Sequence, residues 1–212
     1  MRGILINNLI HTGNDLDLVM TAKNLQAPTL QSQKVEIPGR NGAIDMSEFL
    51  TGEPTYNNRT LSFSFFGNGS RDEVLYLIDT MLEYHGRYIT IVVDDMENWS
   101  YEGRADITYV DHYHYVEFAL TIDAQPFRQA ITPRVYTFTN VTSKGIILKN
   151  EGVRVLPTVK VTAETKIVSG GLAYTLSAGT YEPYQLLLDN GENKWTVTTT
   201  GTITITYREA KI

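Results

Sequence analysis

Period-two alternation of apolar and polar side chains runs through most of this chain, and it constrains the fold more than any other feature. Residues 59–67 place Leu61, Phe63 and Phe65 on one face of a strand. Similar patterns predict strands over residues 88–93, 105–110 and 113–122, the last two joined as a hairpin. The chain is therefore expected to fold as a mainly β protein.

One segment departs from this pattern and predicts a helix from Arg71 to His85. Ser70 precedes it as an N-cap and Glu73 stands three residues later, which together form a capping box. Gly86 then provides a left-handed stop. The face that this helix is expected to bury consists of Val74, Leu75, Leu77, Ile78, Met81 and Leu82. Since the helix lies between two predicted strands, it can close one side of a sheet or sandwich.

The second half of the chain shows no helical period after Val135. Short strands separated by turns at intervals of about 8–12 residues are typical of a β-sandwich. These strands are expected over residues 135–139, 145–149, 158–163, 172–176, 184–188, 194–199 and 202–208. Pro126 and Pro133 bracket a segment typical of a linker. We therefore expect two domains, residues 1–130 and residues 131–212.

The composition excludes several classes of function. The net charge of -6 disfavours nucleic-acid wrapping, because phosphate binding needs a basic surface. The 212 residues include no cysteine, which rules out disulfides and thiolate zinc sites. No window approaches the ~20 apolar residues that cross a bilayer, so membrane insertion is not expected.

No sequence pattern indicates catalysis. The nucleophile elbow, the phosphate loop and the paired-histidine zinc motif are all absent. His112 and His114 would lie on one face of a strand, where two histidines can share a metal. We interpret them as exposed hairpin residues, and the acidic turn at Asp94 and Asp95 as a solvated hairpin tip. No enzyme activity, cofactor or metal is therefore predicted.

Three groups of residues together resemble the distal tail proteins of phages. The first is Ile37-Pro38-Gly39-Arg40-Asn41-Gly42, with Tyr56 and Arg59 just before the first long strand. The second is the single helix. The third consists of Leu148-Lys149-Asn150-Glu151-Gly152, the following Pro157-Thr158-Val159, and the closing hairpin that contains Gly191-Glu192-Asn193-Lys194-Trp195. The resemblance covers nearly the whole chain, and the order of the elements carries more weight than any single match.

This resemblance implies a structural protein of the virion. Residues 1–130 would form a ring-forming "belt" sandwich with one helix, and residues 131–212 a smaller galectin-like β-sandwich. In the family, six belt domains close into a ring that joins the tail tube and tape-measure protein to the tail tip or baseplate. The implied location is the tip of a phage or prophage-encoded tail, assembled from protein made in the bacterial host cytoplasm.

The segment from Glu36 to Asn58 has little apolar period and three glycines. Such a segment can project as an arm onto a neighbouring subunit, which makes it the candidate inter-subunit contact. Its candidate residues are Pro38, Gly39, Arg40, Asn41, Gly42 and Tyr56. A flexible surface loop is the alternative interpretation of the same composition.

A carbohydrate-binding adhesion module that recognises host glycans is the alternative function. In a galectin-like domain, aromatic rings can stack on a sugar, and Trp195 and Tyr184 are the candidate stacking residues. Aromatic residues of small β-sandwiches more often belong to the core, where they fill volume. The structural role is therefore favoured over sugar binding.

Overall fold

The computed structural model describes residues 2–49 and 52–212, and this part of the chain is mainly β with one α-helix. The predicted fold class is thereby confirmed. The chain forms two compact units. Unit 1 runs as far as Arg128 and includes Ile212, and unit 2 comprises Gln129–Lys211. Each unit has its own hydrophobic core.

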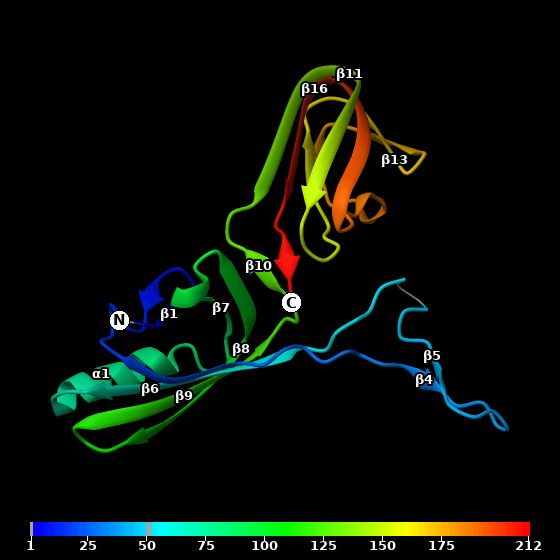
Figure 1. Ribbon diagram of the computed structural model, residues 1–212. Helices are drawn as coiled ribbons and strands as arrows, with labels where there is room; N and C mark the ends of the chain where they lie inside the picture. Colours follow the sequence, from blue (N-terminus) through cyan, green and yellow to red (C-terminus); the bar gives the residue numbers. More distant parts are fainter. Residues whose placement is uncertain (1, 50–51) are drawn as a thin grey trace. The chain divides into compact units, whose positions relative to one another are not determined.

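Unit 1 is built on an antiparallel sheet with the strand order β2-β1-β7-β8-β9-β6-β3 (Figure 1). Its strands are β1 (Ile4–Ile6), β2 (Ile10–His11), β3 (Val19–Leu25), β6 (Arg59–Asn68), β7 (Tyr88–Val93), β8 (Trp99–Asp111) and β9 (Tyr115–Ala124). A 3-10 turn, η1 (Asp94–Met96), joins β7 to β8. This order leaves β3 at one edge of the sheet.

The pairing of β6 with β9 forms the centre of unit 1. The two strands run in register from Arg59 opposite Ala124 to Asn68 opposite Tyr115. Leu61, Phe63 and Phe65 of β6 are all buried, as their alternation predicts. Burying each such side chain contributes roughly 1.5–3 kcal/mol, so this ladder carries much of the core.

Helix α1 (Arg71–Leu82) packs against β6, β8 and β9. The predicted capping box is present, because the Ser70 hydroxyl accepts the Glu73 N–H and the Glu73 carboxylate accepts the Ser70 N–H at 2.7 Å. Arg71 also donates to both carboxylate oxygens of Asp111, at 2.7 and 2.8 Å. That bidentate contact ties the start of the helix to the end of β8.

The helix differs from its prediction at two points. It ends at Leu82 rather than His85, because the N–H groups of Tyr84 and His85 donate three residues back, as in a tighter 3-10 turn. Leu75, expected on the buried face, is 41% exposed. The core beneath the helix is reached by Val74, Leu77, Ile78 and Met81.

Unit 2 contains a second antiparallel sheet, with the order β14-β13-β16-β12-β15 and with β11 also paired to β16. The strands are β11 (Arg134–Asn150), β12 (Thr158–Val161), β13 (Thr165–Ser169), β14 (Leu172–Leu176), β15 (Gly179–Tyr181) and β16 (Gly191–Tyr207). The short β10 (Arg128–Ala130) and β17 (Ala210–Lys211) pair with each other. Figure 1 shows β11 and β16 as the two longest ribbons of this sheet.

The strand predictions for unit 2 need three corrections. Residues 135–139 and 145–149 lie in one strand, as do 194–199 and 202–208, because β11 and β16 stay paired across the irregularities near Val141. The strands β13 and β15 lie in segments for which the sequence pattern predicted no strand. Residues 184–188 are not a strand. They begin as the 3-10 turn η2 (Tyr184–Leu186), closed by the Leu186 N–H that donates to the Pro183 carbonyl at 2.9 Å.

The Asn150-Glu151-Gly152 segment is a tight buried turn. The Asn150 amide donates to the carbonyls of Val153 and Leu188 at 2.8 and 3.0 Å, and its oxygen accepts the Gly152 N–H. A Cβ on Gly152 would lie 2.1 Å from the Ala210 carbonyl oxygen, so only glycine fits there. The turn thus connects the end of β11 to two distant parts of unit 2.

We predict that Asn150→Ala lowers the free energy of unfolding of unit 2 by about 2–3 kcal/mol, because it removes both hydrogen bonds that the buried amide donates and leaves the buried Gly152 N–H without its acceptor. Urea denaturation monitored by circular dichroism measures this loss. The neighbouring exposed variant Lys149→Ala is the control and should change stability by less than about 0.5 kcal/mol. Equal losses in the two variants would contradict the role assigned to the buried amide.

Candidate assembly arm

Residues 26–58, which we call the arm, connect β3 to β6, and none of its described residues (26–49 and 52–58) belongs to a strand of the main sheet. The two halves of the arm pair with each other. Gln31 N–H donates to the Thr55 carbonyl at 2.8 Å, and Asn57 N–H donates to the Thr29 carbonyl at 2.9 Å. Beyond them, β4 (Lys34–Val35) and β5 (Ile44–Asp45) form a small hairpin. Figure 1 shows this hairpin at the end of two extended segments.

Five of the six predicted arm residues lie in the turn between β4 and β5. The Arg40 N–H donates to the Ile37 carbonyl at 3.1 Å. Gly39 and Gly42 have φ values of +82° and +79°, a conformation that favours glycine. Pro38, Arg40 and Asn41 are exposed at this turn. The structure therefore groups residues 38–42 at the tip of the arm.

Tyr56, the sixth predicted residue, lies elsewhere, at the root of the arm. It is bridged to Leu30 across the paired segments. Its ring meets the ring of Phe127 edge-on, with centroids 5.7 Å apart. Tyr56 is thus an anchor within unit 1 rather than a neighbour of the tip residues.

The arm carries large apolar side chains that the described part of the chain covers only in part. Phe49 is 75% exposed, and Leu30, Val35 and Ile37 are each between 43% and 46% exposed. Sequence reasoning named Ile37 only as part of the family resemblance and did not identify any of the four as an exposed apolar side chain. The available signal was their presence in a segment that has neither helical nor strand period and so offers them no core. Burying such side chains against a partner would be favourable.

The root of the arm is held by a buried arginine. Arg59, at the start of β6, is 6% exposed, and its Nε donates to the Gln26 carbonyl at 2.7 Å. Its guanidinium lies 5.3 Å from the centre of the Tyr101 ring. Gln26 N–H in turn donates to the Thr60 carbonyl. Both chain segments of the arm therefore leave the sheet from a fixed point.

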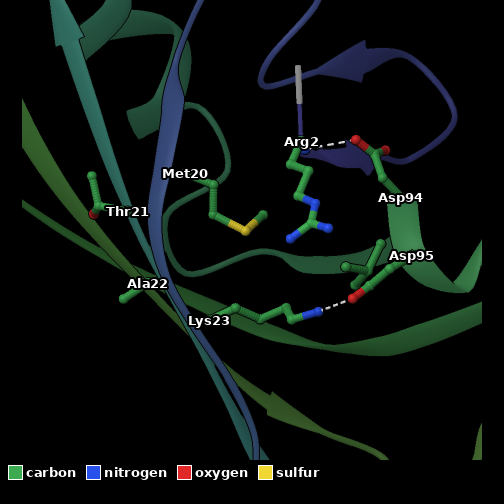
Figure 2. Close-up of a pocket in the computed structure, with 9 residues that line it drawn as sticks. Arg2, Met20, Thr21, Ala22, Lys23, Asp94 and Asp95 are labelled. Atoms are coloured by element: carbon green, nitrogen blue, oxygen red, sulfur yellow. Dashed lines mark hydrogen bonds and ion pairs between the residues drawn. The ribbon is translucent and has the colours of Figure 1, made fainter.

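A pocket of about 200 Å³ lies near the free edge of the sheet, between β3 and the turn η1 (Figure 2). Lys23 crosses it to form an ion pair with Asp95. Asp94 accepts the Gly3 N–H at 2.7 Å and a hydrogen bond from the His11 ring at 2.8 Å. His11 Nδ1 accepts two backbone N–H groups, so its proton lies on Nε2. The charges in the pocket are thus largely paired, and they hold β3 against η1.

The two candidate stacking residues of unit 2 differ in exposure. Trp195 is 2% exposed and belongs to the core, so it presents no free ring face to a sugar. Tyr184 is 76% exposed on η2. The structure does not bring them together as a stacking platform. Sugar stacking stays an untested hypothesis, now confined to Tyr184.

Among the described residues, no group of three or more histidine, aspartate or glutamate side chains could hold a metal ion. The ring of His112 stacks on Tyr115 at 4.3 Å, whereas His114 meets Tyr113 edge-on at 4.8 Å. Both histidines thus pack against aromatic neighbours at the hairpin tip. No helix in the described ranges is both long and apolar enough to cross a membrane.

We predict that the Lys23–Asp95 pair stabilises unit 1 only at pH values where the Asp95 carboxyl is ionised. The hydrogen bond from Lys23 lowers the pKa of the Asp95 carboxyl, an effect that partial burial opposes. A carboxyl group with a lowered folded-state pKa contributes stability above its unfolded value of about 3.9, and this contribution is lost as the pH falls through the folded-state pKa. Asp95→Asn should therefore be less stable than wild type near pH 6, and the difference should shrink as the pH falls below about 4.

Thermal melts of the two proteins across this pH range measure the effect. Asp123→Asn is the matched control, because Asp123 is exposed and forms no ion pair in the described structure. A difference between wild type and Asp95→Asn that stays constant down to about pH 2.5 would show that the ion pair is not its source.

Comparison with known proteins gives one clear result. No protein-family model matches the sequence, and no curated protein matches it either. Among solved structures, the chain is similar to the crystal structure of SPP1 Dit (gp 19.1), described as a paradigm of the hub adsorption apparatus in phages that infect Gram-positive bacteria. The TM-score is 0.66 at 15% identity, over 98% of this chain and 99% of that one. The chain therefore has the fold of a phage distal tail protein.

Proposed function

We propose that this protein is a distal tail hub, a structural protein that forms a ring between the tail tube and the tail tip or baseplate of a phage or phage-like particle. The observation that carries this proposal is the structural similarity to SPP1 Dit, which covers 98% of this chain and 99% of that one. A fold alone does not fix a function. The arm and the sheet edge add independent support, because both need a partner.

The arm is proposed to contact a second copy of the chain. Its tip residues Pro38, Gly39, Arg40, Asn41 and Gly42 would reach the neighbour, while Tyr56 holds the root. Burying the four exposed apolar side chains of the arm would stabilise the contact by several kcal/mol before the entropy of association is counted. A head-to-tail contact of this kind closes into a ring when its rotation allows, and about six copies are proposed.

Strand β3 offers a second surface for self-association. It ends the sheet of unit 1, and its residues Val19–Leu25 are mostly exposed. An edge strand presents unpaired N–H and C=O groups that another chain can engage. Packing β3 beside a neighbouring subunit would protect this edge.

The two units suit a division of roles. We propose that residues 1–130 form the belt domain that builds the ring and that residues 131–212 form a galectin-like domain facing a partner. The proposed partners are the tail tube, tape-measure and tail-tip or baseplate proteins, and the proposed location is the virion. Neither a cofactor nor catalysis is part of this role. Carbohydrate binding has less support, since Trp195 lies in the core.

We predict that the purified protein forms particles of about 140 kDa, the mass of about six 23.9 kDa copies, or that its complex with the tail partner exceeds the partner's own mass by about this amount. Multi-angle light scattering after size-exclusion chromatography measures this mass. A variant in which Gly-Ser replaces residues 34–45 should remain monomeric with unchanged melting temperature, because this hairpin lies outside both cores. Assembly that is equally complete in this variant would contradict a role of the arm in the ring.

A further inference from the structure

Two arginine side chains of unit 1 lie close together near the root of the arm without an acidic partner. Arg59 is 6% exposed and Arg128 is half-buried. Neither guanidinium forms an ion pair with any described carboxylate, although the chain has 24 aspartate and glutamate residues against 18 lysines and arginines. In so acidic a protein, one buried and one half-buried cation that lie close together without a carboxylate are an uncompensated charge.

The side chains around the two arginines cannot neutralise this charge. Arg59 lies over the ring of Tyr101 at 5.3 Å, and Arg128 lies over the ring of Trp99 at 5.1 Å. The Met96 sulfur accepts weak hydrogen bonds from Tyr101 Oη at 3.4 Å and Arg128 Nη1 at 3.5 Å. Aromatic faces and a thioether attract a cation, but they do not supply the strong acceptors that a guanidinium requires.

Specific donor atoms are left without an acceptor. Arg59 Nη1 and Arg128 Nε are both buried and have no hydrogen-bond partner among residues 2–49 and 52–212. Arg59 Nε is already committed to the Gln26 carbonyl. Burial and the charge of Arg128 lower the pKa of the Arg59 guanidinium, with Tyr101 acting in the opposite direction. An unsatisfied buried donor costs free energy unless something outside the described chain accepts its hydrogen bond.

We propose that Arg59 and Arg128 form a binding site for one oxyanion, a carboxylate or a phosphate. An oxyanion accepts several hydrogen bonds at once and carries the charge that the pair lacks, and arginine is the side chain best suited to hold it. The site does not depend on the hub role. Its place beside Gln26 and Tyr101 means that the bound anion would also stiffen the root of the arm.

The first test is thermal stability of the full chain in phosphate against chloride at equal pH and ionic strength. Phosphate should raise the melting temperature by about 5 °C at roughly fifty times its Kd. Arg128→Gln should lose this response, whereas Arg104→Gln, an exposed arginine of the same unit, should keep it. Equal melting of the wild type in the two salts, or an undiminished response in Arg128→Gln, would overturn the proposal.

A second test leaves both arginines unchanged. Trp99 lies under Arg128, whereas Trp195, the other tryptophan, lies in the core of unit 2. Titration with phosphate should therefore change the tryptophan fluorescence saturably, and the change should vanish in Trp99→Phe. A fluorescence that follows ionic strength alone, with sodium chloride as effective as phosphate, would contradict the site even if Arg128→Gln fails to fold.

The same titration distinguishes two sources of the oxyanion. If a carboxylate side chain of a second copy fills the site, phosphate should compete with it and reduce the mass measured by light scattering. If a free anion fills it, phosphate should leave the mass unchanged while it raises the melting temperature. Both results support the site, and each identifies its natural occupant.

Discussion

The ladder between β6 and β9 is the interaction on which the rest of unit 1 depends. Its inner face supplies Leu61, Phe63 and Phe65 to the core under α1, and β8 and β3 pair on either side of it. Because β6 begins where the arm ends, the same ladder fixes the root of the arm through Arg59. The core therefore fixes the position of β6, and β6 in turn fixes the root of the arm.

The arm and the edge strand β3 share one physical feature. Both expose groups that a lone subunit does not satisfy, apolar side chains in the arm and backbone hydrogen-bonding groups at the edge. The capped helix and the tight Asn150 turn, in contrast, satisfy their own polar groups. Complete cores and unsatisfied surfaces are what the proposed ring would require of each subunit.

Much of this architecture could be predicted from the sequence, because short-range patterns determine it. The Ser70–Glu73 capping box and the alternation in β6 are local signals, and both predictions were confirmed. The Tyr184 segment was predicted wrongly, since a neighbouring proline outweighed its strand-like composition. The proximity of Arg59 to Arg128 could not be predicted. These residues are far apart in the chain, and only the folded sheet brings them together.

Electron microscopy of the purified protein, with its tail partner if alone it remains monomeric, tests the hub role most directly. Class averages should show closed rings of about six copies around a central hole, with the arm of each subunit reaching the next. Separate particles of a single copy, both alone and with the partner at high concentration, would contradict a ring-forming hub.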